Sequence, residues 1–424
     1  MPTNVRLLSR PSIPLRRPLG PVARLRGILG PDPAGVRQSF IALVLNSSTS
    51  LVAGGFLGSI TSTFDALPGL LVMVPAAIGL RGNIFGAFGN RISTTIHSGT
   101  FRLSARPDSV LGQNVLATAI LTLAMSVILA VVAKTIAVAL GIAGTISVLD
   151  LAVISIIGGA LASVVVLAAS HGLASGAVRY GWDLDNVTAP LVSTLGDVLT
   201  LPALFLGTFF VGIHLVTPVL GVTLVAAGAA ALVVGLRSKM ALLPRIVRES
   251  LPILTFAGCV SAAAGILLEK RFSSFAAFPA LLVLVPAQLS SSGALGGILT
   301  GRLSSKIHLG VIMPAPVPTR GARADLAYVF LLAAPVFALN GLGAHLVGRL
   351  LGYASPGAVT MVAASVLGGL AAMVFVLALA YYGTILAVRG GVDPDTYGIP
   401  VVSSSVDLIG AFTLILAIVV LGIA

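Results

Sequence analysis

Long apolar runs separated by short polar loops make up most of the chain from residue 36 onward. About eleven such runs are present, and each is close to the roughly 20 residues that a helix needs to cross a bilayer. The first run covers residues 36–60, and the last ends near the C terminus. The pattern therefore predicts an all-α integral membrane protein with about eleven transmembrane helices.

The same pattern of polar and helix-breaking residues occurs twice. Leu67–Gly99 and Phe278–Gly310 align without a gap, at a constant spacing of 211 residues. The shared positions are Pro68, Pro75, Gly82, Gly86, Arg91, Ser93, His97 and Gly99, which recur as Pro279, Pro286, Gly293, Gly297, Arg302, Ser304, His308 and Gly310. The chain is therefore predicted to be an internal duplication of a unit with five spans.

One apolar run, at about residues 217–236, has no counterpart in either half. A sixth span returns the chain to its starting side before the second half begins, so both halves should have the same orientation. Such parallel repeats are related by a pseudo-two-fold axis along the membrane normal. The predicted divisions are a basic N-terminal arm (1–35), a first membrane repeat (36–214), a linking helix with a basic loop (215–246) and a second membrane repeat (247–424).

The composition supports a membrane protein and assigns the two sides. Only 9% of the residues are charged, against about 25% in soluble domains, and the mean hydropathy is +1.08. The net charge of +12 comes from Arg and Lys gathered in the arm and in alternate loops. This distribution follows the positive-inside rule and indicates contact with anionic lipid headgroups, not nucleic acid. We expect a multi-pass protein of the plasma membrane with its N terminus in the cytoplasm and its C terminus outside.

Two aspartates lie deep inside apolar spans at matching places, Asp197 and Asp407. An ionisable group at membrane depth is costly and usually faces a cavity or a transport pathway. Ser193 and Ser403 lie four residues earlier, on the same helical face as each aspartate. The pseudo-two-fold axis should bring the two carboxylates together, and hard divalent cations prefer such oxygen ligands. The alternative is a protonated aspartate that is hydrogen-bonded between helices, or an aspartate that is paired with an arginine.

The stretch from Pro75 to Asn83 contains several helix breakers and predicts an interrupted helix. Backbone carbonyls in this segment would then be free to line a pathway. The alternative is a kinked helix whose glycines serve close packing.

No nucleophile–base pair, phosphate-binding loop or zinc-ligand spacing is present in the sequence, so we do not expect an enzyme.

Two segments resemble a known family. Pro75-Ala-Ala-Ile-Gly79-Leu-Arg-Gly82-Asn83 resembles the Pro…Gly-x-Gly-Gly-Asn segment of the MgtE-type magnesium transporters. The aspartates that follow Pro190 and Pro400 resemble that family's pore aspartate. The doubled arrangement is similar to the eukaryotic solute-carrier relatives, in which two such membrane domains are fused.

This resemblance implies a five-helix unit that pairs about an axis normal to the membrane and binds divalent cations, chiefly Mg²⁺, on that axis. Carried over, the metal site is Asp197 and Asp407, with Asn83 and the backbone near Gly82 and Gly293. One chain would build the whole pore as a monomeric pseudo-dimer. The sequence departs from the family motif at Arg81, where the family has Gly, and at Ala294, where the second copy lacks the Asn.

The sequence thus predicts transport of a divalent cation, most of all Mg²⁺, through a central pore with paired aspartates. The Mg²⁺ ion is the transported substrate and not a cofactor. Two alternatives remain open at this point. The first is an exchanger that couples divalent-cation movement to Na⁺ or H⁺, and the second is a membrane scaffold that transports nothing.

Overall fold

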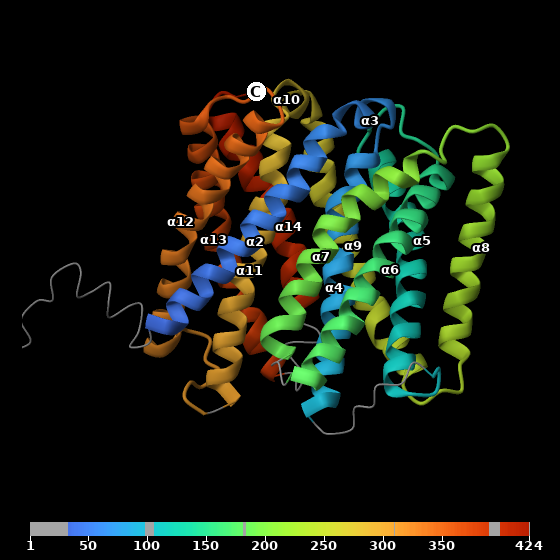
Figure 1. Cartoon of the computed structure of the whole chain (residues 1–424). Coiled ribbons are helices and arrows are strands. Elements are labelled where there is room, and N and C mark those ends of the chain that lie inside the picture. The colour runs from blue at the N-terminus through green and yellow to red at the C-terminus, as the bar shows by residue number, and fades with distance from the viewer. Residues whose placement is uncertain (1–32, 98–105, 181–183, 309, 390–398, 424) are drawn as a thin grey trace, which may run out of the picture.

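The computed structural model describes residues 33–97, 106–180, 184–308, 310–389 and 399–423, and every regular element in these ranges is a helix (Figure 1). In chain order the helices are α2 (Pro33–Ser59), α3 (Thr61–Ala66), α4 (Leu70–His97), α5 (Val110–Ala139), α6 (Val148–Tyr180), α7 (Leu184–Thr208), α8 (Val216–Arg237), α9 (Leu243–Lys270), α10 (Phe272–Ala277), α11 (Ala280–His308), α12 (Arg320–Leu350), α13 (Ala358–Arg389) and α14 (Ile399–Val420).

Ten of the described helices are long and apolar enough to cross a membrane. The remaining long helix is α7, whose apolar segment is shorter within the described residues, Val198–Thr208. The prediction of an all-α membrane protein is therefore confirmed, with α7 standing at the place of the fifth span.

The two repeats run in the same direction. Helices α2 to α7 form the first repeat and α9 to α14 the second. Helix α8 connects the two repeats in the chain and lies at one edge of the bundle (Figure 1). The short helices α3 and α10 follow α2 and α9 at the same end of the molecule, where the C terminus also lies. The unmatched α8 thus restores the starting side before the second repeat, as the count of spans predicts. We name the two ends the α3/α10 end and the opposite end.

The first helix of each repeat is exchanged onto the other repeat. Helix α2 packs along α11 and α12, while α9 packs along α4 and α5. At both crossings a glycine of the first helix meets a valine backbone. A Cβ added at Gly265 would lie 2.7 Å from Val72 Cα, and one added at Gly54 would lie 2.8 Å from Val283 Cα. Since both pairs are related by the 211-residue spacing, the duplication is visible in the packing itself.

The predicted interruption after Pro75 is wrong. Helices α4 and α11 are both continuous and contain Pro75 and Pro286 within them. Proline removes one backbone donor from a helix, but a membrane helix tolerates this where neighbouring helices pack closely. Gly82 and Gly293 therefore lie in helical backbone and not in a loop.

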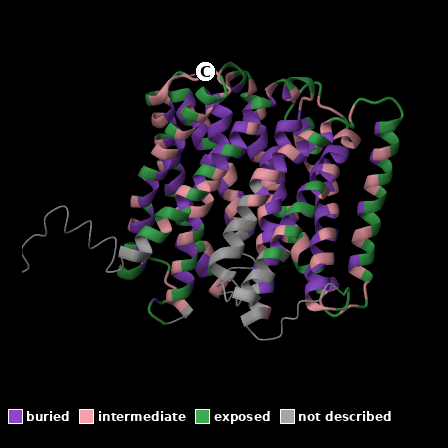
Figure 2. Ribbon diagram, in the orientation of Figure 1, coloured by how far each residue is buried: buried purple, intermediate pink, exposed green. Residues whose placement is uncertain are grey.

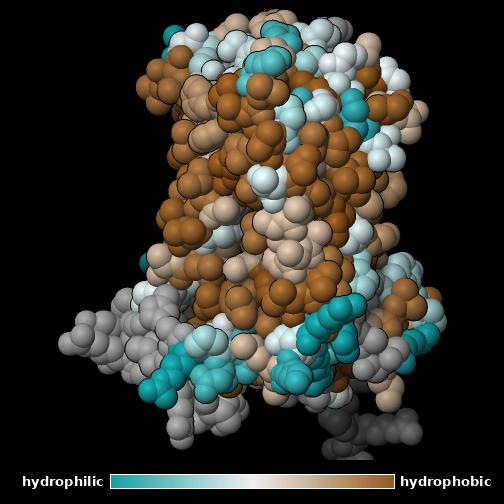
Figure 3. Space-filling model, turned by 90° about the vertical axis from the view of Figure 1, so that its right-hand side faces the viewer, coloured by the Kyte–Doolittle hydropathy of each residue, from teal (hydrophilic) through white to brown (hydrophobic). Residues whose placement is uncertain are grey.

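The buried residues form the contacts between the helices, and the outer faces are apolar. Figure 2 shows buried positions concentrated inside the bundle, whereas α8 is exposed along most of its length. Figure 3 shows a hydrophobic band on this side of the molecule between two ends that carry hydrophilic residues. The exposed side chains of α8 include Val219, Val222, Val233 and Val234. A band of this kind is the surface that lipid covers.

Candidate functional site

The Asp407 carboxylate lies inside the bundle where three helices from both repeats meet. Ser261 of α9 donates a hydrogen bond of 2.7 Å to Asp407 Oδ2. The same oxygen faces Gly79 of α4, because a Cβ added there would lie 3.1 Å from it. The carboxylate therefore contacts α4 at a position that has no side chain, and within the described part of the chain its hydrogen bond is made by Oδ2.

A second polar contact lies one helical turn away on the same two helices. Ser403 of α14 donates to Asn83 Oδ1 of α4 over 3.1 Å, and it also donates to the Pro400 carbonyl over 3.2 Å. Asn83 is 7% exposed, and its Nδ2 has no hydrogen-bond partner among the described residues. The seam between α4 and α14 thus has two layers, Gly79–Asp407 and Asn83–Ser403.

The orientation of the Asn83 amide decides which of its atoms is free. Amide oxygen and nitrogen are assigned from the hydrogen-bond network, and a flip exchanges them. In the flipped orientation Nδ2 donates to Ser403 Oγ, Ser403 donates to Pro400, and the amide oxygen has no partner. This orientation gives Nδ2 one acceptor and leaves a neutral oxygen ligand one turn from the Asp407 carboxylate. Carboxylate, amide and hydroxyl oxygens are a donor set suited to a hard cation.

The structure brings together three of the predicted residues, Asp407, Ser403 and Asn83. The side chains of Asp197 and Ser193 lie outside the part of the chain that is described, although both residues belong to α7. The pairing of the two aspartates therefore stays a prediction. Gly293 lies in α11, and a Cβ added there would meet nothing within 4 Å.

Open space continues along α11 beyond this glycine. Gly297 and Gly301 follow at intervals of one turn, and an added Cβ would again meet nothing within 4 Å. In the first repeat Gly86, the match of Gly297, is open in the same way. Both helices therefore carry glycines whose Cβ side no described residue crowds.

Sequence reasoning missed two residues of the seam, Ser261 and Gly79. The signal for Ser261 was present, because it matches Ser50 of the first repeat at the constant spacing. Both serines come from the exchanged helices, and contacts across repeats cannot be deduced from the spacing alone. Gly79 has Ser290 as its match, so the place that Asp407 uses on α4 carries a hydroxyl on α11.

That hydroxyl belongs to a second polar cluster, between α2 and α11. Ser290 donates to Asn46 Oδ1 over 3.0 Å, and the Nδ2 of Asn46 has no partner. One residue further along each helix, the hydroxyls of Ser47 and Ser291 lie 3.1 Å apart. Asn340 of α12 completes the cluster by donating to Ser291 over 2.9 Å. The second repeat thus carries neutral polar groups at the depth where the first faces Asp407.

Arg81 is a third feature that sequence reasoning did not place. It lies on α4 between Gly79 and Asn83, and only 4% of it is exposed. Its Nη1 donates to the Gly159 carbonyl and, over 2.7 Å, to Ser163 Oγ, both on α6. The guanidinium therefore points away from Asp407, because residues two apart on a helix face nearly opposite sides.

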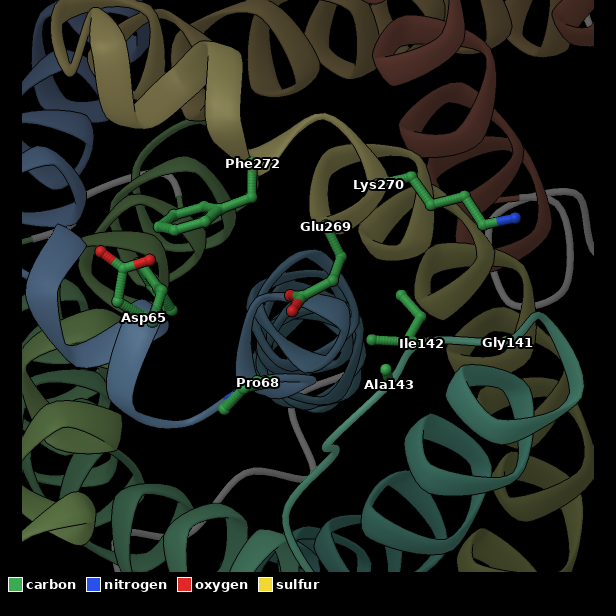
Figure 4. Close-up of a pocket in the computed structure, with 9 residues that line it drawn as sticks. Asp65, Pro68, Gly141, Ile142, Ala143, Glu269, Lys270 and Phe272 are labelled. Carbon is green, nitrogen blue, oxygen red and sulfur yellow. The ribbon is translucent and has the colours of Figure 1, made fainter.

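A cavity of about 280 Å³ opens at the α3/α10 end, above the N terminus of α4. Figure 4 shows the Glu269 carboxylate over the end of that helix, with Asp65 to one side and Lys270 extending away. Glu269 Oε1 accepts a 2.8 Å hydrogen bond from the Gly69 N–H. A carboxylate at a helix N terminus satisfies free donors and is favoured by the helix dipole. Glu269 is therefore a cap of α4 supplied by the other repeat.

The second repeat fills the corresponding place differently. Gly58 of α2 is the match of Glu269, and the ring of Tyr353 lies 2.8 Å from a Cβ added at Gly58. The Tyr353 hydroxyl donates to the Gly55 carbonyl over 3.0 Å. The match of Tyr353 is Ile142, which lines the cavity. The cavity thus exists because the smaller Ile142 replaces the tyrosine ring.

The opposite end carries a matched pair of arginines with unequal partners. Arg302 and Lys306 form ion pairs of 2.9 and 2.5 Å with Asp325, which is 1% exposed. In the first repeat Arg91 donates to Asn114 over 2.8 Å, and Asn114 takes the place of Asp325. Burial lowers the pKa of Arg91, and the charge of Glu249 acts in the other direction. The matched arginine therefore forms an ion pair with a carboxylate in the second repeat and a hydrogen bond to an uncharged amide in the first.

Comparison with known proteins agrees with these observations. The chain is similar to solute carrier family 41 member 3 of Mus musculus, with 24% identity over 380 residues, 83% of this chain and 75% of that protein. It is also similar to solute carrier family 41 member 3 of Rattus norvegicus, with 25% identity over 407 residues, 89% of this chain and 86% of that protein. No solved structure matches the chain significantly.

The model of the MgtE family, described as a divalent cation transporter, matches the chain twice, at residues 74–207 and 285–417. Both matches contain the proline-and-glycine helix and the aspartate helix of one repeat. Together they cover more than half of the chain. It is a multi-pass integral membrane protein and belongs to the MgtE family of divalent cation transporters, with two copies of the domain in one chain.

Proposed function

We propose that this protein carries Mg²⁺ across the plasma membrane through a pathway between its two repeats, with Asp407 as a principal ligand. The observation that carries the proposal is the seam of α4, α9 and α14. It places a carboxylate, two hydroxyls and an amide together inside the membrane-spanning bundle. A lipid-buried carboxylate has a high cost unless it serves a pathway or a bound ion.

The geometry suits an ion that keeps part of its water. Mg²⁺ loses water reluctantly and binds through one or two carboxylates while several waters remain. Ser261 holds one oxygen of Asp407 and thereby orients the carboxylate. The other oxygen, the Asn83 amide and the open backbone along Gly293 and Gly297 leave room for a hydrated ion. Asp197, as the match of Asp407, would supply the second carboxylate.

The orientation in the membrane follows from the distribution of charge. Arg237, Lys239, Arg302 and Lys306 lie at the opposite end, and the positive-inside rule assigns that end to the cytoplasm. The basic N-terminal arm would then meet anionic headgroups of the inner leaflet. Because one chain contains both repeats, a monomer suffices to form the pathway.

Mg²⁺ flux into proteoliposomes tests this function. We expect flux with the wild-type protein and its near-complete loss in Asp407→Asn, with Asp65→Asn as the matched control, since Asp65 lies in the cavity at the α3/α10 end and away from the seam. Flux that ignores imposed Na⁺ and pH gradients indicates a channel, whereas flux that requires one of them indicates a coupled exchanger. Equal flux in wild type and Asp407→Asn would contradict the proposal.

A further inference from the structure

The guanidinium of Arg81 is a buried charge inside the bundle that the packing of the described residues does not explain. Arg81 lies in the transmembrane part of α4, and among the described residues its charged group donates to the Gly159 carbonyl and the Ser163 hydroxyl. Among the residues that the structure describes, no acid lies within ion-pair distance of it. Arginine stays charged at any physiological pH, so its charge cannot be removed by deprotonation.

The second repeat shows that the fold does not need a charge at this position. The match of Arg81 is Ser292, which is fully buried and donates only to the Gln288 carbonyl of its own helix, over 2.8 Å. The space that the guanidinium takes beside Gly159 is filled by the ring of Phe337 beside Gly369. An uncharged apolar filling is therefore compatible with this architecture, and the charge in the first repeat requires another reason.

The charge stands at the depth of the cation site. Gly79 and Asn83, which precede and follow Arg81 by two residues, contact Asp407 and Ser403. The guanidinium is on the other side of the same helix, so about one helix diameter, roughly 10 Å, separates it from the site. The backbone of α7 lies against Arg81 as well, because a Cβ added at Gly196 would be 3.7 Å from Arg81 Cβ. Gly196 directly precedes Asp197.

We propose that Arg81 is a permanent internal counter-charge that weakens cation binding in the pathway and thereby speeds release of the ion. This inference rests on the proposed function. Two aspartates and one arginine give the region a formal charge of −1 in place of −2. Transport needs a site that attracts the ion and still lets it leave. A fixed positive charge about 10 Å away in a poorly screened interior lowers the affinity for a divalent ion by roughly tenfold to a hundredfold.

Removal of the charge without loss of length tests the proposal. We expect Arg81→Gln to lower the KM for Mg²⁺ flux into proteoliposomes by about tenfold or more, and to lower the maximal rate because release slows. Arg81→Lys keeps the charge and should keep the wild-type KM. Ser163→Ala removes a hydrogen-bond partner but no charge, so it should also keep the wild-type KM. Arg81→Met provides a second uncharged variant if the glutamine variant does not fold.

The outcomes separate this inference from the proposed function. If Arg81→Gln and Arg81→Met keep the wild-type KM while Asp407→Asn abolishes flux, the inference is wrong and the function stands. If Arg81→Lys changes KM as much as Arg81→Gln does, the residue acts through packing, and the inference is again wrong. If the wild-type protein moves no divalent cation, both fail. A lowered KM in the uncharged variants alone supports the counter-charge.

Discussion

The exchange of the first helices between repeats makes a sharp prediction at Gly265. Its helix α9 crosses α4 so closely that a Cβ would lie 2.6 Å from the Val72 carbonyl carbon and 2.7 Å from Val72 Cα. Carbon atoms pack best at about 3.5–4.0 Å, so the Gly265→Ala substitution requires the two backbones to separate by about 1 Å. Both partners are helical backbone, and neither can yield by a change of rotamer.

The expected cost follows from that separation. Forcing extra volume into a packed interior costs about 1–3 kcal/mol, and a gap of this size removes a quarter to a half of the attraction at each neighbouring contact. Alanine otherwise favours a helix by about 1 kcal/mol over glycine. We therefore expect a net loss of about 1–2 kcal/mol for Gly265→Ala, toward the upper end of that range, and a similar loss for the matched Gly54→Ala.

The matched control has the opposite sign. Gly301 of α11 has nothing within 4 Å of an added Cβ, so Gly301→Ala should gain up to about 1 kcal/mol from helix propensity alone. Thermal unfolding in detergent at one scan rate measures all three variants, because membrane proteins often unfold irreversibly. If Gly265→Ala melts at or above the wild-type temperature, α9 does not cross α4 as described, and the helix exchange is refuted.

Three further predictions concern single side chains. Ser261→Ala should lower Mg²⁺ flux at limiting Mg²⁺ by about tenfold, because a hydrogen bond to a charged group contributes about 1.5–3 kcal/mol. Ser261→Thr keeps the hydroxyl and should retain flux. Equal flux in the two variants would argue against this hydrogen bond. Glu269→Ala should cost about 1 kcal/mol of stability by removing the cap of α4, whereas Asp65→Ala, exposed beside it, should cost little in thermal unfolding. Asp325→Asn should lower the stability by about 2 kcal/mol, because it breaks the ion pairs with Arg302 and Lys306, whose side chains are about one third exposed. Glu249→Gln, which breaks an exposed ion pair with Arg245, should cost less than about 0.5 kcal/mol.

The hydrophobic pattern and the internal repeat were sufficient to predict the architecture. Residue 75 and its match at 286 established the spacing, and the unmatched run that became α8 established that the repeats are parallel. Both arguments depend on counting along the chain, which requires no knowledge of contacts. The same reasoning failed at Pro75, because neighbouring helices hold α4 together where its own sequence favours a break.

The residues of the site were predicted where the same residue type recurs at matching positions or where the family motif contains the residue. Asp407 stood out because a buried acid is rare in a membrane helix, and Ser403 followed from its place one turn away. Asn83 was found through the family motif. Ser261 was not found, since it reaches Asp407 only because α9 lies between α14 and α4. The structural importance of Arg81 was also missed, because it has no charged match in the second repeat.

The central claim is that a divalent cation binds beside Asp407, between α4 and α14. The most direct measurement is an experimental structure of the protein with bound Mn²⁺, which is located by its anomalous scattering. We expect a peak near Asp407 Oδ1 and the Asn83 amide, at about 2 Å for direct ligation or about 4 Å through one water. The peak should be absent in Asp407→Asn. An ion found only in the cavity between Asp65 and Glu269, with none at Asp407, would contradict the account.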